Sequence, residues 1–163
     1  ADKCRETLRP ADDVPVRAVA CANDGSFLAA ATRDADVYVW RPDDSDAHCL
    51  DHIIEAAHDA DSDRTYVLSC RASPDARLLV TTASDKTAKI WNARRGFALE
   101  KTLAQHQRWV WDACFSADSA YLVTASSDHS ARLWDLSSGA AIRYYSGHSL
   151  AVTCCALNDS SAA

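Results

Sequence analysis

Two sets of side chains in this sequence combine a hydroxyl, an imidazole and a carboxylate. These are the groups with which a hydrolase attacks a carbonyl, the aspartate orienting a histidine that takes the hydroxyl proton. The sets are His58, Thr81 and Asp85, and His106, Thr124 and Asp128. In both, a tryptophan (Trp91 or Trp134) follows the aspartate by six residues. Hydrolysis does not need that tryptophan, so the recurring set indicates packing rather than catalysis, and we expect no catalytic residue.

An acidic run, DADSD at residues 59–63, has the alternating aspartates that open a calcium-binding loop. Arg64 stands where such a loop needs glycine, and Cys70 where it needs a bidentate glutamate. The sequence also lacks a C-x-x-C pair and a glycine-rich phosphate loop. We therefore expect no metal site, no cofactor and no enzyme.

The composition narrows the class of partner. The chain has 163 residues, a net charge of −6 and 48% hydrophobic residues, which is typical of a globular domain. Without a dense basic cluster it is not expected to bind nucleic acid, and without a long apolar run it is not expected to insert into a membrane. Its seven cysteines, an odd number, favour reduced thiols in the cytoplasm. It contains no methionine, even at position 1, which suggests a fragment.

An internal repeat organises the chain. Three stretches align, and in each an aspartate precedes a tryptophan by six residues, as Asp34 precedes Trp40. They are SFLAAATRDADVYVW (26–40), RLLVTTASDKTAKIW (77–91) and AYLVTASSDHSARLW (120–134). Each contains two strand-like runs and is flanked by two more, so each unit predicts four strands joined by tight turns. The last two tryptophans, Trp91 and Trp134, are 43 residues apart, within the roughly 40–45 residues of a β-propeller blade.

The repeat resembles the WD-repeat family of β-propellers. The predicted fold is all-β: three four-stranded blades, at residues 13–57, 65–104 and 108–146, and the first strand of a closing blade at 150–158. In a WD-repeat blade, histidine, Ser/Thr, turn aspartate and third-strand tryptophan form one hydrogen-bonded chain. The two sets above match it, whereas the first unit has Asp34 and Trp40 but Ala30 at the hydroxyl position and no obvious histidine. We expect the first blade to be the least tightly held.

Because propeller blades stack face to face, their rims are the surfaces left for partners. The top rim carries the loop before each first strand and the turn before each aspartate. On it we expect a partner-binding set rich in the residue types that dominate protein interfaces. This set is Trp109, Trp111, Tyr66, Arg17, Arg33 and Ser127. The alternative for the tryptophan pair is that Trp111 fills the channel mouth and only Trp109 is exposed.

Several stretches, among them RWVWDACFSADSAYLVTASSDHSARLW (108–134) and GHSLAVTCCALNDS (147–160), resemble one subfamily. It is the WD-repeat subunit of target-of-rapamycin kinase complexes, in its C-terminal half. The resemblance implies an open arc of a seven-bladed ring and a non-catalytic scaffold that binds and stabilises the kinase domain through the top rim. It also implies a cytoplasmic protein whose complex associates peripherally with endomembranes.

Two expectations remain beside this one. The motif WNAR (91–94) half resembles the Trp-Asp-x-Arg box of cullin ubiquitin-ligase substrate receptors, but Asn92 replaces the aspartate. A receptor of that kind is the alternative function. In addition, an open arc leaves bare blade faces, so we expect this chain to need a missing N-terminal propeller half or a second arc.

Overall fold

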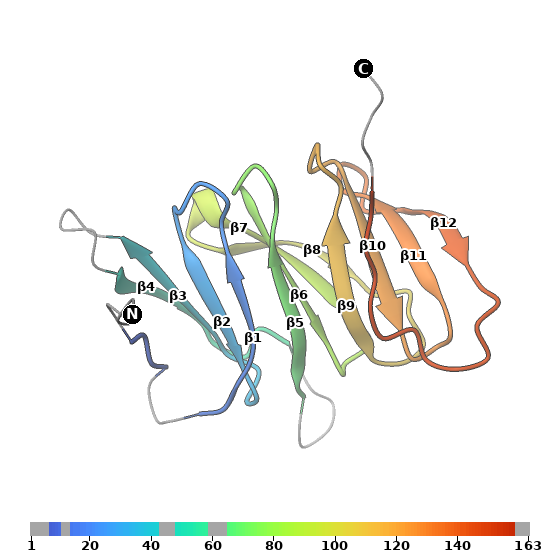
Figure 1. Cartoon of the computed structure of the whole chain (residues 1–163), viewed down its shortest axis with the longest axis horizontal. Coiled ribbons are helices and arrows are strands. Elements are labelled where there is room, and N and C mark those ends of the chain that lie inside the picture. The colour runs from blue at the N-terminus through green and yellow to red at the C-terminus, as the bar shows by residue number, and fades with distance from the viewer. Residues whose placement is uncertain (1–6, 11–13, 43–47, 59–64, 159–163) are drawn as a thin grey trace, which may run out of the picture.

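The computed structural model describes residues 7–10, 14–42, 48–58 and 65–158. They form three four-stranded antiparallel sheets whose strands neighbour one another in chain order, which confirms the predicted all-β class (Figure 1). The first sheet contains β1 (Val16–Cys21), β2 (Leu28–Thr32), β3 (Val37–Pro42) and β4 (His48–Ile54). The second contains β5 (Val67–Ala72), β6 (Leu78–Ala83), β7 (Ala88–Asn92) and β8 (Ala98–Leu103). The third contains β9 (Val110–Phe115), β10 (Tyr121–Ser126), β11 (Ala131–Asp135) and β12 (Ala141–Tyr145).

The turn between the first and second strand of each sheet is built in the same way. An aspartate side chain accepts a hydrogen bond from the backbone N–H two residues later, at 2.9–3.1 Å. The intervening residue has a positive φ of 73°, 56° or 60°. These residues are Gly25, Ala76 and Ser119. Only the first is a glycine, so the aspartate stabilises a backbone conformation that alanine and serine disfavour.

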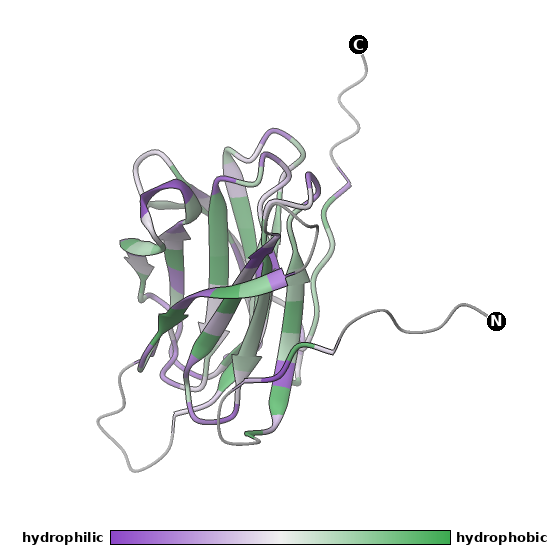
Figure 2. Ribbon diagram, turned by 90° about the vertical axis from the view of Figure 1, so that its left-hand side faces the viewer, coloured by the Kyte–Doolittle hydropathy of each residue, from purple (hydrophilic) through white to green (hydrophobic). Residues whose placement is uncertain are grey.

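The three sheets stand side by side as blades, with β1 packed against β5 and β5 against β9. Apolar side chains fill both inter-blade spaces, and Figure 2 shows hydrophobic residues along the strands with polar residues mainly in the loops. Trp91 lies in the core shared with the first blade, and Trp134 in the core shared with the second. Each of these tryptophans therefore joins its own blade to the preceding one.

The outer face of the first blade is apolar. Trp40 is buried under Leu8 and stacks on Tyr38, with ring centroids 6.1 Å apart. Beside it, a cavity of about 220 Å³ is lined by apolar residues that include Val19, which is 67% exposed. The third blade also exposes apolar side chains, such as Ile142 at 49%. Both ends of the arc thus present surfaces typical of blade interfaces.

The predicted strand at residues 150–158 is not a regular strand in the structure. This segment runs alongside the third blade, where the Val152 N–H donates to the Ser126 carbonyl at 3.0 Å (Figure 1). A strand requires a ladder of hydrogen bonds with a neighbouring strand. Among the described residues there are no further strands of its own blade to supply that ladder.

Candidate functional site

The hydrogen-bonded set of the third blade links four elements. The loop before β9 carries His106, whose Nδ1 lies 2.8 Å from Asp128 Oδ2 and whose Nε2 lies 2.7 Å from Thr124 Oγ1. The Trp134 indole N–H donates to the same hydroxyl at 2.8 Å. The aspartate lies in the turn after β10, the threonine in β10 and the tryptophan in β11. One chain of polar groups therefore holds the rim turn to the blade core.

The protons in this set can be placed by elimination. Burial raises the pKa of Asp128, but hydrogen bonds from Ser130, His106 and the Gln107 backbone outweigh it and lower that pKa to about 2. An ionised carboxylate only accepts, so His106 Nδ1 carries the donated proton. For the imidazole, burial has the opposite effect and lowers the pKa of His106 below its ordinary value. The neutral ring then accepts at Nε2, and Thr124 donates to it.

The second blade repeats these contacts. His58 Nδ1 lies 2.8 Å from Asp85 Oδ2, its Nε2 lies 2.7 Å from Thr81 Oγ1, and the Trp91 indole donates to that hydroxyl at 2.9 Å. Thr81, like Thr124, is completely buried. A hydroxyl that no substrate can reach cannot serve as a nucleophile. The two sets are thus arranged as structural clamps.

In the first blade the same positions are not joined. Asp34 is exposed, and Trp40 faces Ala30, which has no hydroxyl. The turn is held instead by Asp36, whose Oδ1 accepts the Ala56 N–H at 2.8 Å. Nothing in the sequence pattern distinguished Asp36, because it stands two positions after the aspartate of the repeat.

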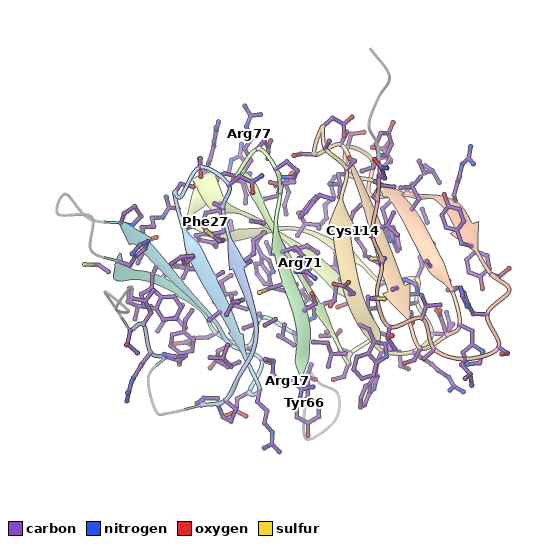
Figure 3. The ribbon with its side chains drawn as sticks, in the orientation of Figure 1. Arg17, Phe27, Tyr66, Arg71, Arg77 and Cys114 are labelled. Carbon is purple, nitrogen blue, oxygen red and sulfur yellow. The ribbon has the colours of Figure 1, made fainter. Side chains whose placement is uncertain are left out.

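The first strand of every blade carries a β-bulge at the top rim, the edge drawn lowest in Figure 1. The extra residue is Arg17 in β1, Leu68 in β5 and Trp111 in β9. A bulge turns a side chain away from the direction that strand alternation would give it. Figure 3 shows Arg17 and Tyr66 projecting from this rim. The bulge is therefore the local feature that directs the first-strand side chains of the predicted binding set.

Trp109 and Trp111 lie together on the rim of the third blade, with ring centroids 5.7 Å apart. Trp109 is 43% exposed, and its carbonyl accepts the Ser127 N–H at 2.9 Å. Trp111 is half-buried, and its indole N–H donates to Ser127 Oγ at 2.5 Å. Trp109 is therefore the more exposed of the pair, as in the alternative in which Trp111 fills the channel mouth; that position for Trp111 stays a prediction. Ser127 is the residue that anchors both.

The remaining predicted rim residues belong to the first two blades. The Arg33 guanidinium lies 5.9 Å from the centre of the Tyr66 ring, which joins these blades across the rim. Arg33 and Arg17 are exposed, and Tyr66 is half-buried. Arg108, beside Trp109, is also exposed. Exposed aromatic and guanidinium groups thus extend along one edge of all three blades.

The described part of the chain has no group of three or more His, Cys, Asp or Glu residues that could hold a metal ion. The acidic run 59–63 lies outside the described residues. None of the described helices has the length and apolar character needed to cross a membrane.

The repeated four-stranded blades and their recurring hydrogen-bonded sets are those of a β-propeller repeat protein. The family model "WD domain, G-beta repeat" matches residues 2–41, 52–92 and 97–135, and the chain belongs to this family. The solved structure of U3-55K superimposes with a TM-score of 0.74 at 22% identity, over 88% of this chain and 42% of that one. At that identity the likeness shows the propeller fold alone.

Two curated relatives make the resemblance more specific. The target of rapamycin complex subunit LST8 of Saccharomyces cerevisiae is 46% identical over 160 residues, which is 97% of this chain and 51% of that protein. The target of rapamycin complex subunit wat1 of Schizosaccharomyces pombe is 47% identical over 161 residues, which is 97% of this chain and 50% of that protein. The predicted resemblance to this subfamily is confirmed. The chain spans about half the length of these relatives.

Proposed function

We propose that this chain is a non-catalytic subunit of a target-of-rapamycin complex, acting in the cytoplasm as a scaffold that binds and stabilises the kinase domain. Membership of such a complex is supported by two relatives that are named as target of rapamycin complex subunits. The observation that carries the binding role is the clustering of Trp109, Trp111, Tyr66 and two arginines on one rim. We infer that this rim contacts the kinase.

The physical argument for the rim is its residue content. Tryptophan and tyrosine provide large contact areas with little loss of side-chain freedom. Together with arginine, they account for much of the energy in protein interfaces. Trp109 is already held by its neighbour Trp111 and by the Ser127 backbone, so binding costs little further ordering. A preorganised, exposed tryptophan is the residue we expect to matter most.

Replacing Trp109 with alanine tests this role. We expect Trp109→Ala to weaken capture of the kinase domain roughly 30-fold, the effect of losing about 2 kcal/mol at an interface hot spot. Its free energy of unfolding should change by no more than about 1 kcal/mol, because the side chain is 43% exposed. The measurements are affinity for the kinase domain and urea denaturation.

Tyr121→Ala is the matched control. Tyr121 is an aromatic residue with similar exposure, 40%, but it begins β10 at the opposite edge of the blade. We expect it to leave kinase capture unchanged. Equal losses of kinase affinity in both variants, or no loss in Trp109→Ala, would contradict kinase binding through the top rim. Capture of a cullin adaptor in place of the kinase would favour the alternative function, a ubiquitin-ligase substrate receptor.

We also propose that further blades, or a second arc, cover the outer faces of the first and third blades. The apolar cavity beside Val19 and the exposed Ile142 support this, because a free domain rarely leaves such blade faces open to water. We expect the 163-residue chain alone to self-associate in sedimentation experiments. A compact monomer that melts reversibly would contradict this proposal.

A further inference from the structure

The C-terminal segment brings a second cysteine to the third blade. The Cys155 N–H donates to Asp112 Oδ2 at 3.3 Å, and its Sγ lies 3.6 Å from the Val123 carbonyl oxygen. Val123 is the β10 partner of Cys114 in the β9–β10 ladder. Cys155 Sγ therefore contacts the residue paired with Cys114, and the two thiols, 41 residues apart in the sequence, are close enough for each to shift the pKa of the other. In Figure 3, Cys114 lies between β9 and the final segment.

The surroundings make the two sulfurs unequal. A hydrogen bond from Cys155 lowers the pKa of Cys114, and Arg71 assists, against the opposing effects of burial and the Asp112 charge. The same hydrogen bond, together with burial, raises the pKa of Cys155. Of the two thiols, Cys114 is therefore the more readily ionised. By contrast, burial raises the pKa of Cys70 to about 12, which keeps that thiol unreactive.

We propose that Cys114 and Cys155 form a reversible disulfide that ties the C-terminal segment to the third blade when the protein meets a peroxide. The Cys114 thiolate attacks a peroxide oxygen, the O–O bond breaks, and a sulfenic acid and one water result. The neutral sulfenic acid no longer carries the Cys114 charge that helped to raise the pKa of Cys155. The Cys155 sulfur then attacks the Cys114 sulfur, and the hydroxyl leaves with the Cys155 proton as a second water. Two thiols and one hydrogen peroxide thus give one disulfide and two waters.

The bond would strengthen the attachment of the final segment to the third blade. Residues 150–158 form no strand ladder, and the backbone hydrogen bonds given above, from Val152 and Cys155, attach them to the blade. A covalent link at Cys155 would hold the segment in place whether or not neighbouring strands are present. This inference depends on the thiol geometry and not on the proposed kinase partner.

The test treats the folded chain with hydrogen peroxide, blocks remaining thiols and maps cross-linked peptides by mass spectrometry. We expect a cross-link between the peptides 109–132 and 144–163 that dithiothreitol removes. Cys154 adjoins Cys155 but is more exposed, so it gives the matched control. Cys154→Ser should retain the cross-link, and Cys155→Ser should lose it. No cross-link in the folded protein, or equal cross-linking in Cys155→Ser, would overturn the proposal.

A second measurement needs no variant. Phenylarsine oxide bridges two thiols only when they lie close together, so it should protect Cys114 and Cys155 jointly from alkylation in the reduced wild-type chain. Cys21, which is exposed in the first blade, should remain fully alkylated. Independent alkylation of Cys114 and Cys155 in the presence of this probe would also refute the pairing.

Discussion

Trp134→Ala is expected to destabilise the chain by roughly 3–5 kcal/mol, the usual cost of removing a large aromatic side chain from a core. Trp134 is 1% exposed and packs between the second and third blades. Its loss would leave a cavity at that interface and remove the indole N–H that donates to Thr124. The measurement is the free energy of unfolding by urea denaturation, compared with the wild-type chain.

Trp109→Ala provides the comparison, because it removes the same atoms from a side chain that is 43% exposed. A similar loss of stability in both variants would mean that Trp109 is a core residue and would weaken the binding proposal.

Thr124→Val separates the effect of hydrogen bonding from the effect of side-chain volume. It should cost about 1–3 kcal/mol, since it leaves His106 and Trp134 without their shared hydroxyl.

Asp128→Ala is expected to cost roughly 2–4 kcal/mol. The carboxylate accepts hydrogen bonds from His106 Nδ1, the Gln107 N–H and Ser130, and each donor loses its partner in the variant. The equivalent change in the first blade, Asp34→Ala, should stay within about 0.5 kcal/mol because Asp34 is exposed. Equal costs would show that the hydrogen-bonded set does not clamp the blade.

The effect of Asp128→Ala should depend on pH. The folded pKa of Asp128, about 2, lies below its ordinary value of 3.8, so its contribution to stability is complete above that value. It is lost as the pH falls through the folded pKa. We expect the difference between wild type and variant to shrink by about 1 kcal/mol between pH 5 and pH 3. A difference that stays constant over this range would mean that the ionised form is not what stabilises the fold.

Much of the fold could be predicted from the sequence because its signals are local. The six residues from Asp128 to Trp134 run from the turn of one hairpin into its second strand. The hydrogen bonds that shape a hairpin depend on residues close together in the chain. The turn aspartates act within two residues. Twelve strands in three units follow from such signals. So does the lack of a hydrogen-bonded set at these positions of the first blade, since Ala30 cannot supply a hydroxyl.

The tertiary structure decided what depends on distant neighbours. The alternation of side chains along β9 could not show that a bulge redirects Trp111, whose indole N–H donates to Ser127. Nor could it show that Trp109 is the more exposed of the two tryptophans. Residues 150–158 have an apolar strand-like pattern, but without partner strands among the described residues they form no ladder. Nor could spacing reveal that Cys155 meets Cys114. Propensity and turn chemistry act over a few residues, whereas exposure and thiol pairing require the blades to be packed together.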